Sequence, residues 1–216
     1  MKLKTETGLP LLLCRLLAGR GIYSAEQAQE FFNGSELSDP FLIKDMDKAV
    51  QAVEDAVNSD TKITVYGDYD CDGVTATVML YSHLEALGAD VNYYIPTREE
   101  GYGLNENAIR KISEEGTGLI ITVDNGVSAV NEAELIYKLG MKLVITDHHQ
   151  LPDVLPRAEA IVNPHRSDDA SPYKDYAGCG VVLKLIMALE GDADGVLEQY
   201  SDIASIGTIG DVVPLT

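Results

Sequence analysis

The sequence has little of three things: cysteine, positive charge and long apolar runs. Its three cysteines, Cys14, Cys71 and Cys179, are odd in number, lie far apart and include no CxxC pair. This pattern excludes a disulfide framework and a zinc knuckle and favours reduced thiols. The longest apolar run, around residues 9–17, is interrupted by a proline and an arginine and is too short to span a membrane. The charged start lacks the apolar stretch of a signal peptide, so we expect a globular, cytoplasmic protein.

Positively charged residues are also scarce. The chain has 16 Lys and Arg against 35 Asp and Glu, which gives a net charge of −19. A protein that binds nucleic acid normally supplies cations that replace the counterions on the phosphates, and this chain has no basic cluster. Two interpretations stay open at this point. The acidic residues can form an ordinary soluble surface, or divalent metal ions can supply the positive charge where it is needed, with any broad DNA-binding surface elsewhere.

The 216 residues, 45% of them hydrophobic, are enough for one sizeable core or for a main domain with a small appendage. The first segment, to about Asn33, is predicted to be helical. Ser24 is the expected N-cap of a helix over Ala25–Phe32, and Gly34 is its expected stop. Apolar residues at three-and-four spacing predict a further helix over Met46–Asn58.

From residue 62 onward, short β-rich runs alternate with helical patterns. The predicted strands cover residues 63–66, 91–95, 119–123, 143–146 and 161–162, and the predicted helices cover residues 74–87, 106–114 and 128–139. This alternation implies right-handed crossovers and parallel strand pairing. The predicted fold class is therefore α/β: a doubly wound, mostly parallel five-stranded sheet with helices on both faces, preceded by a short helical N-terminal segment.

Acidic residues and histidines follow three of these predicted strands at the point where each strand ends. Asp68, Asp70 and Asp72 follow the first strand, Asp124 follows the third, and Asp147, His148 and His149 follow the fourth. Ligands of open parallel sheets bind beyond the carboxyl ends of the strands, which share one edge. We therefore expect these side chains to converge.

Clustered carboxylates repel one another and are costly to bury, so a fold that gathers them usually supplies cations. Carboxylate oxygens with one or two imidazoles suit Mn²⁺ or Mg²⁺ better than Zn²⁺. Two such ions would balance the four candidate carboxylates of Asp70, Asp72, Asp124 and Asp211 and leave a near-neutral site for an anionic phosphodiester. Two-metal hydrolases hold their ions about 3.5–4 Å apart and use them for phosphate chemistry. The sequence thus predicts metal-dependent phosphoester hydrolysis.

Other interpretations account for less of the same motifs. Residues 68–73 match the first half of an EF-hand loop, but loop position twelve is Met79 and a strand precedes the motif. Residues 70–74 also resemble the haloacid dehalogenase signature, which leaves the histidine pair unexplained. Asp124 and the two residues after it, taken alone, are typical of an Asx turn. We interpret His83 and His165 as structural or solvated.

Taken together, the motifs resemble the DHH phosphoesterases, a family named for the triplet that stands here at residues 147–149. The resemblance runs from about residue 11 to the last residue. Motifs at residues 65–73, 100–105, 177–181 and 210–215 are similar to those of RecJ-type exonucleases, and residues 41–46 resemble the segment before the family's catalytic domain. The resemblance implies a helical N-terminal segment over residues 1–44 and a DHH catalytic domain over residues 45–216.

The resemblance also implies a ligand set. Asp70 and Asp72 would ligate metal, Asp124 would bridge two divalent cations, Mn²⁺ or Mg²⁺, and His148 and Asp211 would complete the coordination. The residues expected to act in catalysis are Asp124, His148 and His149.

Four further residues receive supporting roles. His149 would ligate metal or contact the scissile phosphate, and Asp147 would orient the histidines. Asp68 would give similar support or stabilise its turn. Arg98 would contact phosphate or remain an exposed loop cation.

The implied activity is 5′-to-3′ exonuclease action on single-stranded DNA in DNA repair and recombination. Relatives continue into a DHH-associated domain and often an oligonucleotide-binding barrel, so we expect this chain to be the N-terminal catalytic part. Two alternatives stay open. One is a DHH-family enzyme acting on short oligonucleotides, cyclic dinucleotides or pyrophosphate, and the other is a non-catalytic DHH-like scaffold, a class that typically loses the ligands retained here.

Overall fold

The computed structural model describes residues 2–33 and 37–215. The chain forms two compact units, Met1–Ser38 and Asp39–Thr216. The sequence-based boundary between residues 44 and 45 stays a prediction.

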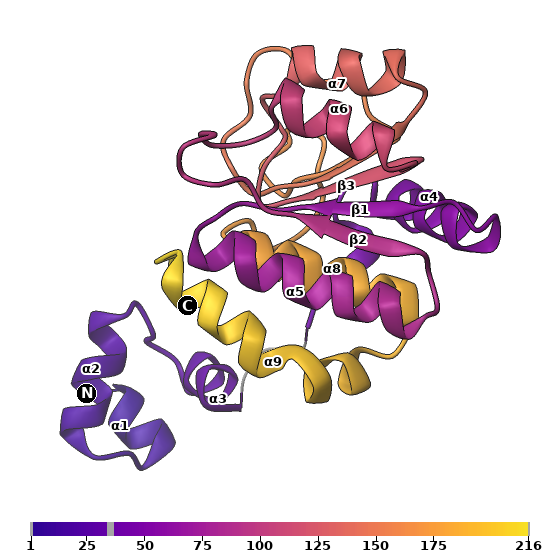
Figure 1. Ribbon diagram of the computed structural model, residues 1–216. Helices are drawn as coiled ribbons and strands as arrows, with labels where there is room; N and C mark the ends of the chain where they lie inside the picture. Colours follow the sequence, from indigo (N-terminus) through magenta and orange to yellow (C-terminus); the bar gives the residue numbers. More distant parts are fainter. Residues whose placement is uncertain (1, 34–36, 216) are drawn as a thin grey trace. The chain divides into compact units, whose positions relative to one another are not determined.

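The larger unit is built on one five-stranded sheet (Figure 1). Its strands are β1 (Ile63–Tyr66), β2 (Val91–Tyr94), β3 (Leu119–Val123), β4 (Lys142–Thr146) and β5 (Ala160–Val162), in the order β2-β1-β3-β4-β5. Every neighbouring pair is parallel; Val65, for example, pairs with Tyr93 on one side and with Ile121 on the other. The predicted α/β class and all five predicted strands are confirmed.

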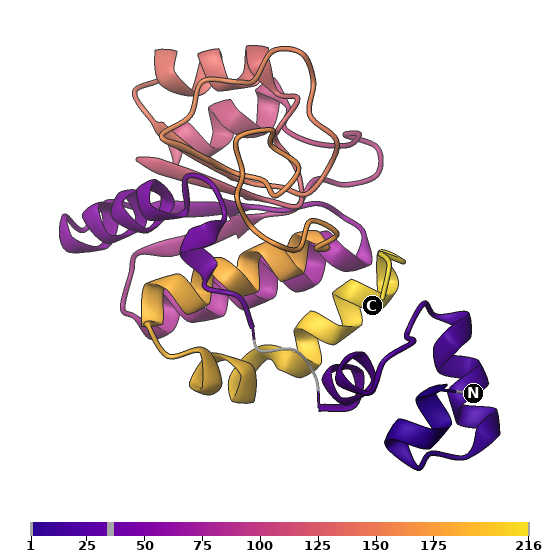
Figure 2. The same ribbon diagram turned by 180° about the vertical axis from the view of Figure 1, so that it is seen from behind.

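Helices cover both faces of this sheet, as predicted for a doubly wound fold (Figures 1 and 2). One layer contains α4 (Met46–Asn58), α5 (Cys71–Ala86), α8 (Gly178–Glu190) and α9 (Ala193–Gly210), and the other contains α6 (Glu106–Glu114) and α7 (Val130–Lys138). A short 3-10 helix, η1 (Pro40–Leu42), precedes α4. The helix predicted over Met46–Asn58 has those same bounds.

The strands separate the two layers because successive side chains point to opposite faces. In β3, Ile121 and Val123 pack in the core beneath α5 and α8, whereas Ile120 packs in the core beneath α6 and α7. All five residues of β3 are buried. Such continuous apolar strands are expected where both faces of a parallel sheet are covered.

Helices α8 and α9 were not predicted from the sequence. Residues 181–183 and 185–189 of α8 are all apolar, and nine of its thirteen residues are buried. A helix that is buried nearly all round has no polar stripe, so the three-and-four spacing that reveals a surface helix is missing.

The smaller unit contains α1 (Lys2–Thr7), α2 (Leu11–Gly19) and α3 (Ala25–Asn33). Ser24 caps α3 as predicted, because its hydroxyl accepts a hydrogen bond from the Gln27 N–H at 3.1 Å. The predicted stop at Gly34 lies outside the described residues.

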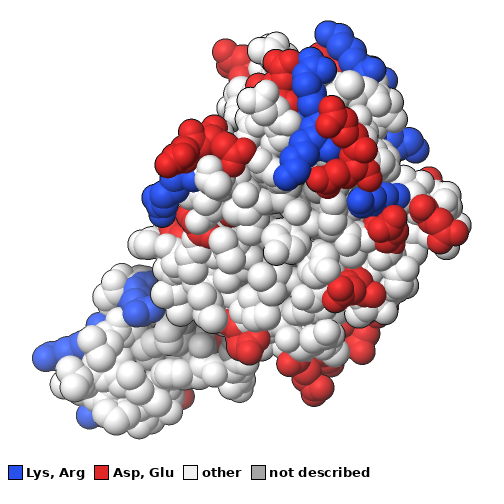
Figure 3. Space-filling view, viewed as in Figure 1, with Lys and Arg blue, Asp and Glu red and all other residues white. Residues whose placement is uncertain are grey.

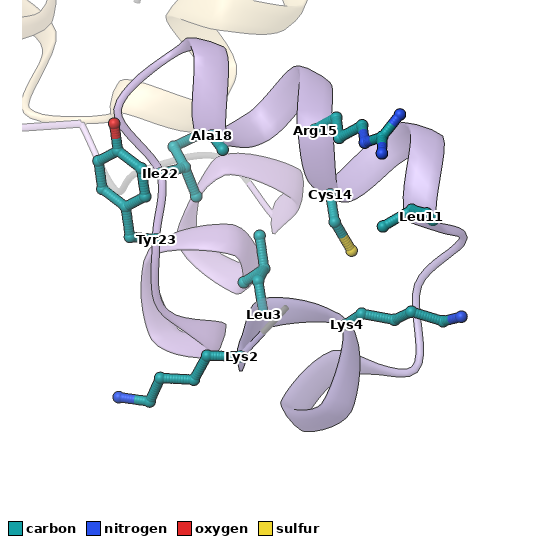
Figure 4. Close-up of a pocket in the computed structure, with 9 residues that line it drawn as sticks. All are labelled: Lys2, Leu3, Lys4, Leu11, Cys14, Arg15, Ala18, Ile22 and Tyr23. Atoms are coloured by element: carbon teal, nitrogen blue, oxygen red, sulfur yellow. The ribbon is translucent and has the colours of Figure 1, made fainter.

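A pocket of about 560 Å³ has Leu3 and Cys14 at its floor and Lys4 and Arg15 at its rim (Figure 4). None of the described helices has the length and apolar character needed to cross a membrane.

Candidate metal centre

The strand order has a switch point between β1 and β3. The chain leaves β1 into α5 on one face of the sheet and leaves β3 toward α7 on the other face. At such a switch point the connections diverge, and the carboxyl ends of the two strands are left open for a ligand. The predicted acidic residues lie at this opening.

Asp70 and Asp72 stand at the start of α5, directly beyond β1. The Asp70 carboxylate caps the helix, because its Oδ1 accepts a hydrogen bond from the Gly73 N–H at 2.9 Å. Only glycine fits at position 73, where a Cβ would lie 2.6 Å from the Asp68 Cβ and 2.7 Å from its backbone nitrogen. The tight turn therefore holds Asp68 close to the two ligand candidates.

The Asp72 carboxylate, which is 1% exposed, is held by the start of α8. Its Oδ2 accepts a hydrogen bond from the Gly178 N–H at 2.5 Å, and its Oδ1 accepts one from the Cys179 N–H at 2.8 Å. The partial positive charge at a helix N-terminus favours a carboxylate in this place. A segment more than one hundred residues downstream thus fixes the orientation of Asp72.

Asp124, at the end of β3, is the most perturbed carboxylate of the centre. It is 2% exposed and its backbone is left-handed, with φ of 62°. A left-handed backbone is uncommon for a residue other than glycine and is often found at functional sites. Burial first, and then the carboxylates of Asp72 and Asp70, raises the pKa of Asp124 to about 10. The surroundings of this carboxylate therefore lack positive charge, which a bound cation would supply.

His148, at the end of β4, points into the same cluster. Its Nε2 lies 3.1 Å from Asp124 Oδ1, 3.7 Å from Asp72 Oδ2 and 3.7 Å from Asp211 Oδ2. Asp211 follows the last turn of α9, and its pKa is raised by burial and by the carboxylates of Asp72 and Asp70, although His148 lowers it. Residues from β1, β3, β4 and α9 thus meet at one point.

Three groups of described side chains have potential ligand atoms within 4.8 Å of one another. They are Asp72, His148 and Asp211; Asp68, Asp70 and Asp124; and Asp124, His148 and His149. Asp124 belongs to two of these groups. The structure therefore brings together all five predicted ligands, and it adds Asp68, for which the sequence predicted a supporting role.

Asp147 organises the histidine pair. Its Oδ1 accepts hydrogen bonds from the His148 N–H at 2.7 Å, from the His149 N–H at 3.1 Å and from His149 Nδ1 at 2.8 Å, while its Oδ2 accepts one from the Val127 N–H at 2.9 Å. Burial alone would raise the pKa of Asp147, but the hydrogen bonds and the His149 ring lower it. The Asp147 carboxylate correspondingly raises the pKa of His149, although burial opposes this change. This geometry fits the predicted orienting role, which stays a prediction.

The donor set fits divalent ions. Buried atoms Asp68 Oδ1, Asp124 Oδ1 and His148 Nε2 have no hydrogen-bond partner among the described residues. Unsatisfied buried polar atoms are costly and therefore indicate a missing partner. Oxygen donors with one or two imidazoles are the ligands that Mn²⁺ and Mg²⁺ accept.

Two further residues lie near the centre, one with a predicted role and one without. Arg98 lies 5.0 Å from the ring centre of Tyr69 and is exposed, so its predicted phosphate contact stays a prediction. Tyr102 reaches the centre, although no role was predicted for it; its only signal was its place in the motif at residues 100–105. The two remaining histidines take no part in these groups: His83 is buried on α5, 3.6 Å from Glu190, and His165 lies in a loop.

Comparison with known proteins shows to which family this chain belongs. The model of the DHH family, N-terminal domain, matches residues 62–208, which is more than half of the chain. The chain belongs to the DHH family. The match begins just before β1 and includes both the Asp70–Asp72 turn and the histidine pair, so the family's domain contains most of the described centre.

Within the DHH family, the chain is similar to RecJ proteins. The single-stranded-DNA-specific exonuclease RecJ of Bacillus subtilis (strain 168) is 44% identical over 207 residues, covering 94% of this chain and 26% of that protein. The crystal structure of RecJ from Thermus thermophilus in complex with Mn²⁺ matches with a TM-score of 0.81 at 28% identity, over 99% of this chain and 30% of that chain. The same protein in complex with Mg²⁺ matches with a TM-score of 0.66 at 27% identity, over 99% and 27%. This DHH chain therefore spans less than a third of these relatives.

Proposed function

We propose that this chain hydrolyses phosphodiester bonds with two divalent ions and forms the catalytic part of a single-stranded-DNA exonuclease. The observation that carries the proposal is Asp124, a buried carboxylate with a left-handed backbone and a strongly raised pKa that belongs to two potential ligand groups at once. A carboxylate between two cation sites explains the burial, the raised pKa and the membership of two groups, because two positive charges would offset its burial.

The two groups that flank Asp124 support two ions. Asp124 with Asp68 and Asp70 would hold one ion. Asp124 with His148 would hold the other, together with Asp72 and Asp211, which form a group with His148. Mn²⁺ or Mg²⁺ fits these donors, and both ions occur in the RecJ complexes of Thermus thermophilus. The raised pKa of Asp124 would return toward its usual range when the ions bind, because a nearby cation favours the carboxylate form.

The chain's residues prepare the centre for an anionic substrate. Bound divalent ions supply the positive charge that activates water and stabilises charge on the phosphoryl oxygens. Asp147 keeps the His149 ring directed at the opening, where it is 45% exposed and can donate a hydrogen bond to a phosphate oxygen. The backbone N–H groups at the start of α8 hold the Asp72 carboxylate in place.

Single-stranded DNA as the substrate rests on the similarity to RecJ. The 5′-to-3′ polarity rests only on what the resemblance of the sequence motifs implies. The face seen in Figure 3 shows acidic and basic side chains interspersed over α6 and α7 and few charges over α5 and α9. No broad cationic surface lies on this face of the described residues. We propose that the metal ions bind the reacting phosphate and that other parts of a longer protein supply most of the contacts to the strand.

The test is metal-dependent digestion of single-stranded DNA labelled at its 5′ or 3′ end. We expect release of nucleotides from the 5′ end with Mn²⁺ or Mg²⁺, no release with EDTA, and loss of activity by about 10³-fold or more in Asp124→Ala. Asp153→Ala, an exposed loop carboxylate, is the matched control and should retain full activity. Robust cleavage by Asp124→Ala would refute the site.

The same assay includes a labelled dinucleotide and a cyclic dinucleotide. Faster turnover of these compounds than of long strands would favour an enzyme for small phosphodiesters over an exonuclease. Failure to bind Mn²⁺ in calorimetry would instead favour a non-catalytic scaffold.

A further inference from the structure

A loop over residues 95–105 brings Tyr102 to the edge of the metal centre. Gly101 and Gly103, the residues on either side of Tyr102, have φ of 91° and 81°. A backbone with left-handed bends on both sides of one residue strongly favours glycine at both bends. The loop therefore has the form needed to extend one aromatic side chain away from its own backbone, and this side chain is Tyr102.

The Tyr102 hydroxyl lies between two predicted catalytic residues that come from different strands. It donates a hydrogen bond to the main-chain oxygen of Asp124 at 3.3 Å. It also lies 3.3 Å from His149 Nδ1 and 3.4 Å from His149 Nε2, and the two rings meet edge to face with their centres 5.7 Å apart. One hydroxyl thus joins the end of β3 to the residues after β4.

The Tyr102 hydroxyl contacts Asp124 at its main-chain oxygen, in the residue whose backbone is left-handed. The left-handed conformation of Asp124 directs its carbonyl away from the regular strand pattern, and Tyr102 supplies the donor for this carbonyl. Loss of the hydroxyl would leave the carbonyl to water and would remove one restraint on the Asp124 backbone.

The contact with His149 is a second restraint on that ring. The single proton of the Tyr102 hydroxyl is used on Asp124, so its oxygen remains as an acceptor for a ring N–H. Nδ1 donates to Asp147 Oδ1, and Nε2, when it carries a proton, is the ring donor left for the Tyr102 oxygen. At 3.4 Å this bond is long, so a phosphate oxygen can share the same N–H. Without Tyr102, the ring would keep its hydrogen bond to Asp147 and its contact with the His148 ring, whose centre lies 4.5 Å away.

We infer that Tyr102 is a positioning residue that holds His149 and the Asp124 backbone in the orientation used for phosphodiester hydrolysis. The inference rests on the proposed function for its catalytic consequence and on the hydrogen bonds for its structural part. Tyr102 contacts only the main-chain oxygen of Asp124, but the ring nitrogens of His149 that it contacts belong to a potential ligand group, so the tests follow the His149 ring and kcat rather than metal affinity.

The first test measures the ring of His149 directly. Long-range proton–nitrogen NMR spectra of the Mg²⁺-loaded chain, with ¹⁵N-labelled histidine, resolve Nδ1 and Nε2 of each ring. Tyr102→Phe should shift the Nε2 resonance of His149 and leave those of His83 and His165 unchanged. Tyr93→Phe is the matched control, because Tyr93 is exposed on β2 and contacts the ring of Tyr81, away from the centre.

The second test measures catalysis with the same variants. Tyr102→Phe should lower kcat on single-stranded DNA about tenfold, the effect of one hydrogen bond, with KM changed by less than about twofold. Tyr93→Phe should match the wild type in every respect.

Two outcomes would overturn the inference: an unchanged His149 resonance in Tyr102→Phe, or an unchanged kcat in the same variant. If the wild-type chain cleaves no phosphodiester, the proposed function fails instead. The histidine resonance then decides by itself whether Tyr102 orients His149.

Discussion

The two helical layers of the larger unit each bury an apolar core but contribute differently to the metal centre. The α5, α8 and α9 layer supplies Asp70 and Asp72, the N–H groups that hold Asp72, and Asp211. The described helices of the opposite layer, α6 and α7, supply none of the potential ligands. The sheet thus determines where the centre lies, and the α8 N–H groups orient the Asp72 carboxylate, whereas Val127, from the core of the opposite layer, holds Asp147.

Helices α8 and α9, in the layer that supplies ligands, also pack closely against the metal centre. A Cβ at Gly178 would lie 2.6 Å from Asp124 Oδ1, and one at Gly207 would lie 2.2 Å from Thr75 Oγ1 and 3.1 Å from Asp72 Oδ1. At Gly178 and Gly207, helices α8 and α9 therefore lie too close to neighbouring residues of the centre to carry any side chain. The difference between the layers can be tested by changing one layer at a time.

The largest effect on stability is expected in the layer without ligands. Ile109→Ala on α6 removes a fully buried side chain and should lower the free energy of unfolding by about 2–5 kcal/mol. The metal centre should remain intact, so kcat measured well below the melting temperature should stay at the wild-type value. Urea denaturation and initial rates check this prediction, and a large loss of kcat in the folded variant would contradict the division between layers.

Gly178→Ala is the converse change, in the layer with ligands. The added methyl group would collide with Asp124, so we expect kcat to fall about 100-fold, equivalent to about 2.7 kcal/mol of barrier. Gly180→Ala, two residues further along α8, is the control, because its Cβ would lie 3.2 Å from an atom of the Tyr176 ring and not near the carboxylates. Equal activity in the two variants would count against the account.

A smaller loss is expected from Asp147→Asn. The amide no longer favours the Nδ1 proton of His149 and keeps fewer acceptor sites for the two backbone N–H groups. Removal of such an orienting partner typically costs about 10–100-fold in metal affinity or activity. Mn²⁺ calorimetry and initial rates check the prediction, and wild-type values in both would show that Asp147 is not needed to orient the histidines.

The smallest expected effect is on the melting temperature of metal-free Asp124→Asn, and it is a gain in stability rather than a loss. In metal-free protein the raised pKa of Asp124 favours its protonated form, so its contribution to stability is fully present below the unfolded value and is lost as pH rises toward about 10. Asp124→Asn removes this dependence. With EDTA at pH 8, the melting temperature of the variant should exceed that of the wild type by about 3 °C, roughly the effect of 1 kcal/mol.

Addition of Mn²⁺ should reverse this order, because bound ions stabilise only the protein that can hold them. Differential scanning calorimetry at pH 5 and pH 8, with EDTA and with Mn²⁺, provides the four comparisons. A variant that melts below the wild type in EDTA at pH 8 would contradict the expected sign.

The difference between the two helical layers also explains which helices, strands and ligands could be predicted from the sequence. Strands β1 and β3 to β5 were recognised because buried parallel strands are short apolar runs, and α6 was recognised because one face is polar. The edge strand β2, none of whose residues is buried, was recognised by its valine and tyrosines, which favour strands. Most of the ligands were recognised because they directly follow those strands. Helix α8 carries no such alternation, and only the fold shows that the start of α8 holds Asp72.

Tyr102 and Asp68 illustrate the remaining gap. Tyr102 reaches the centre through a loop whose path depends on two left-handed glycines, and no local pattern fixes where such a loop ends. For Asp68 the sequence predicted only support of the ligands or of its own turn. In the structure the tight turn after β1, closed by Gly73, brings Asp68 into one group with Asp70 and Asp124.

The central claim is that Asp124 lies between two divalent ions. Electron paramagnetic resonance of the chain titrated with Mn²⁺ tests it most directly, because two Mn²⁺ ions that share a carboxylate about 3.5–4 Å apart are magnetically coupled. We expect two Mn²⁺ per chain with a coupled spectrum, and loss of the coupling in Asp124→Asn. A single bound ion, or two ions with uncoupled spectra, would contradict the account.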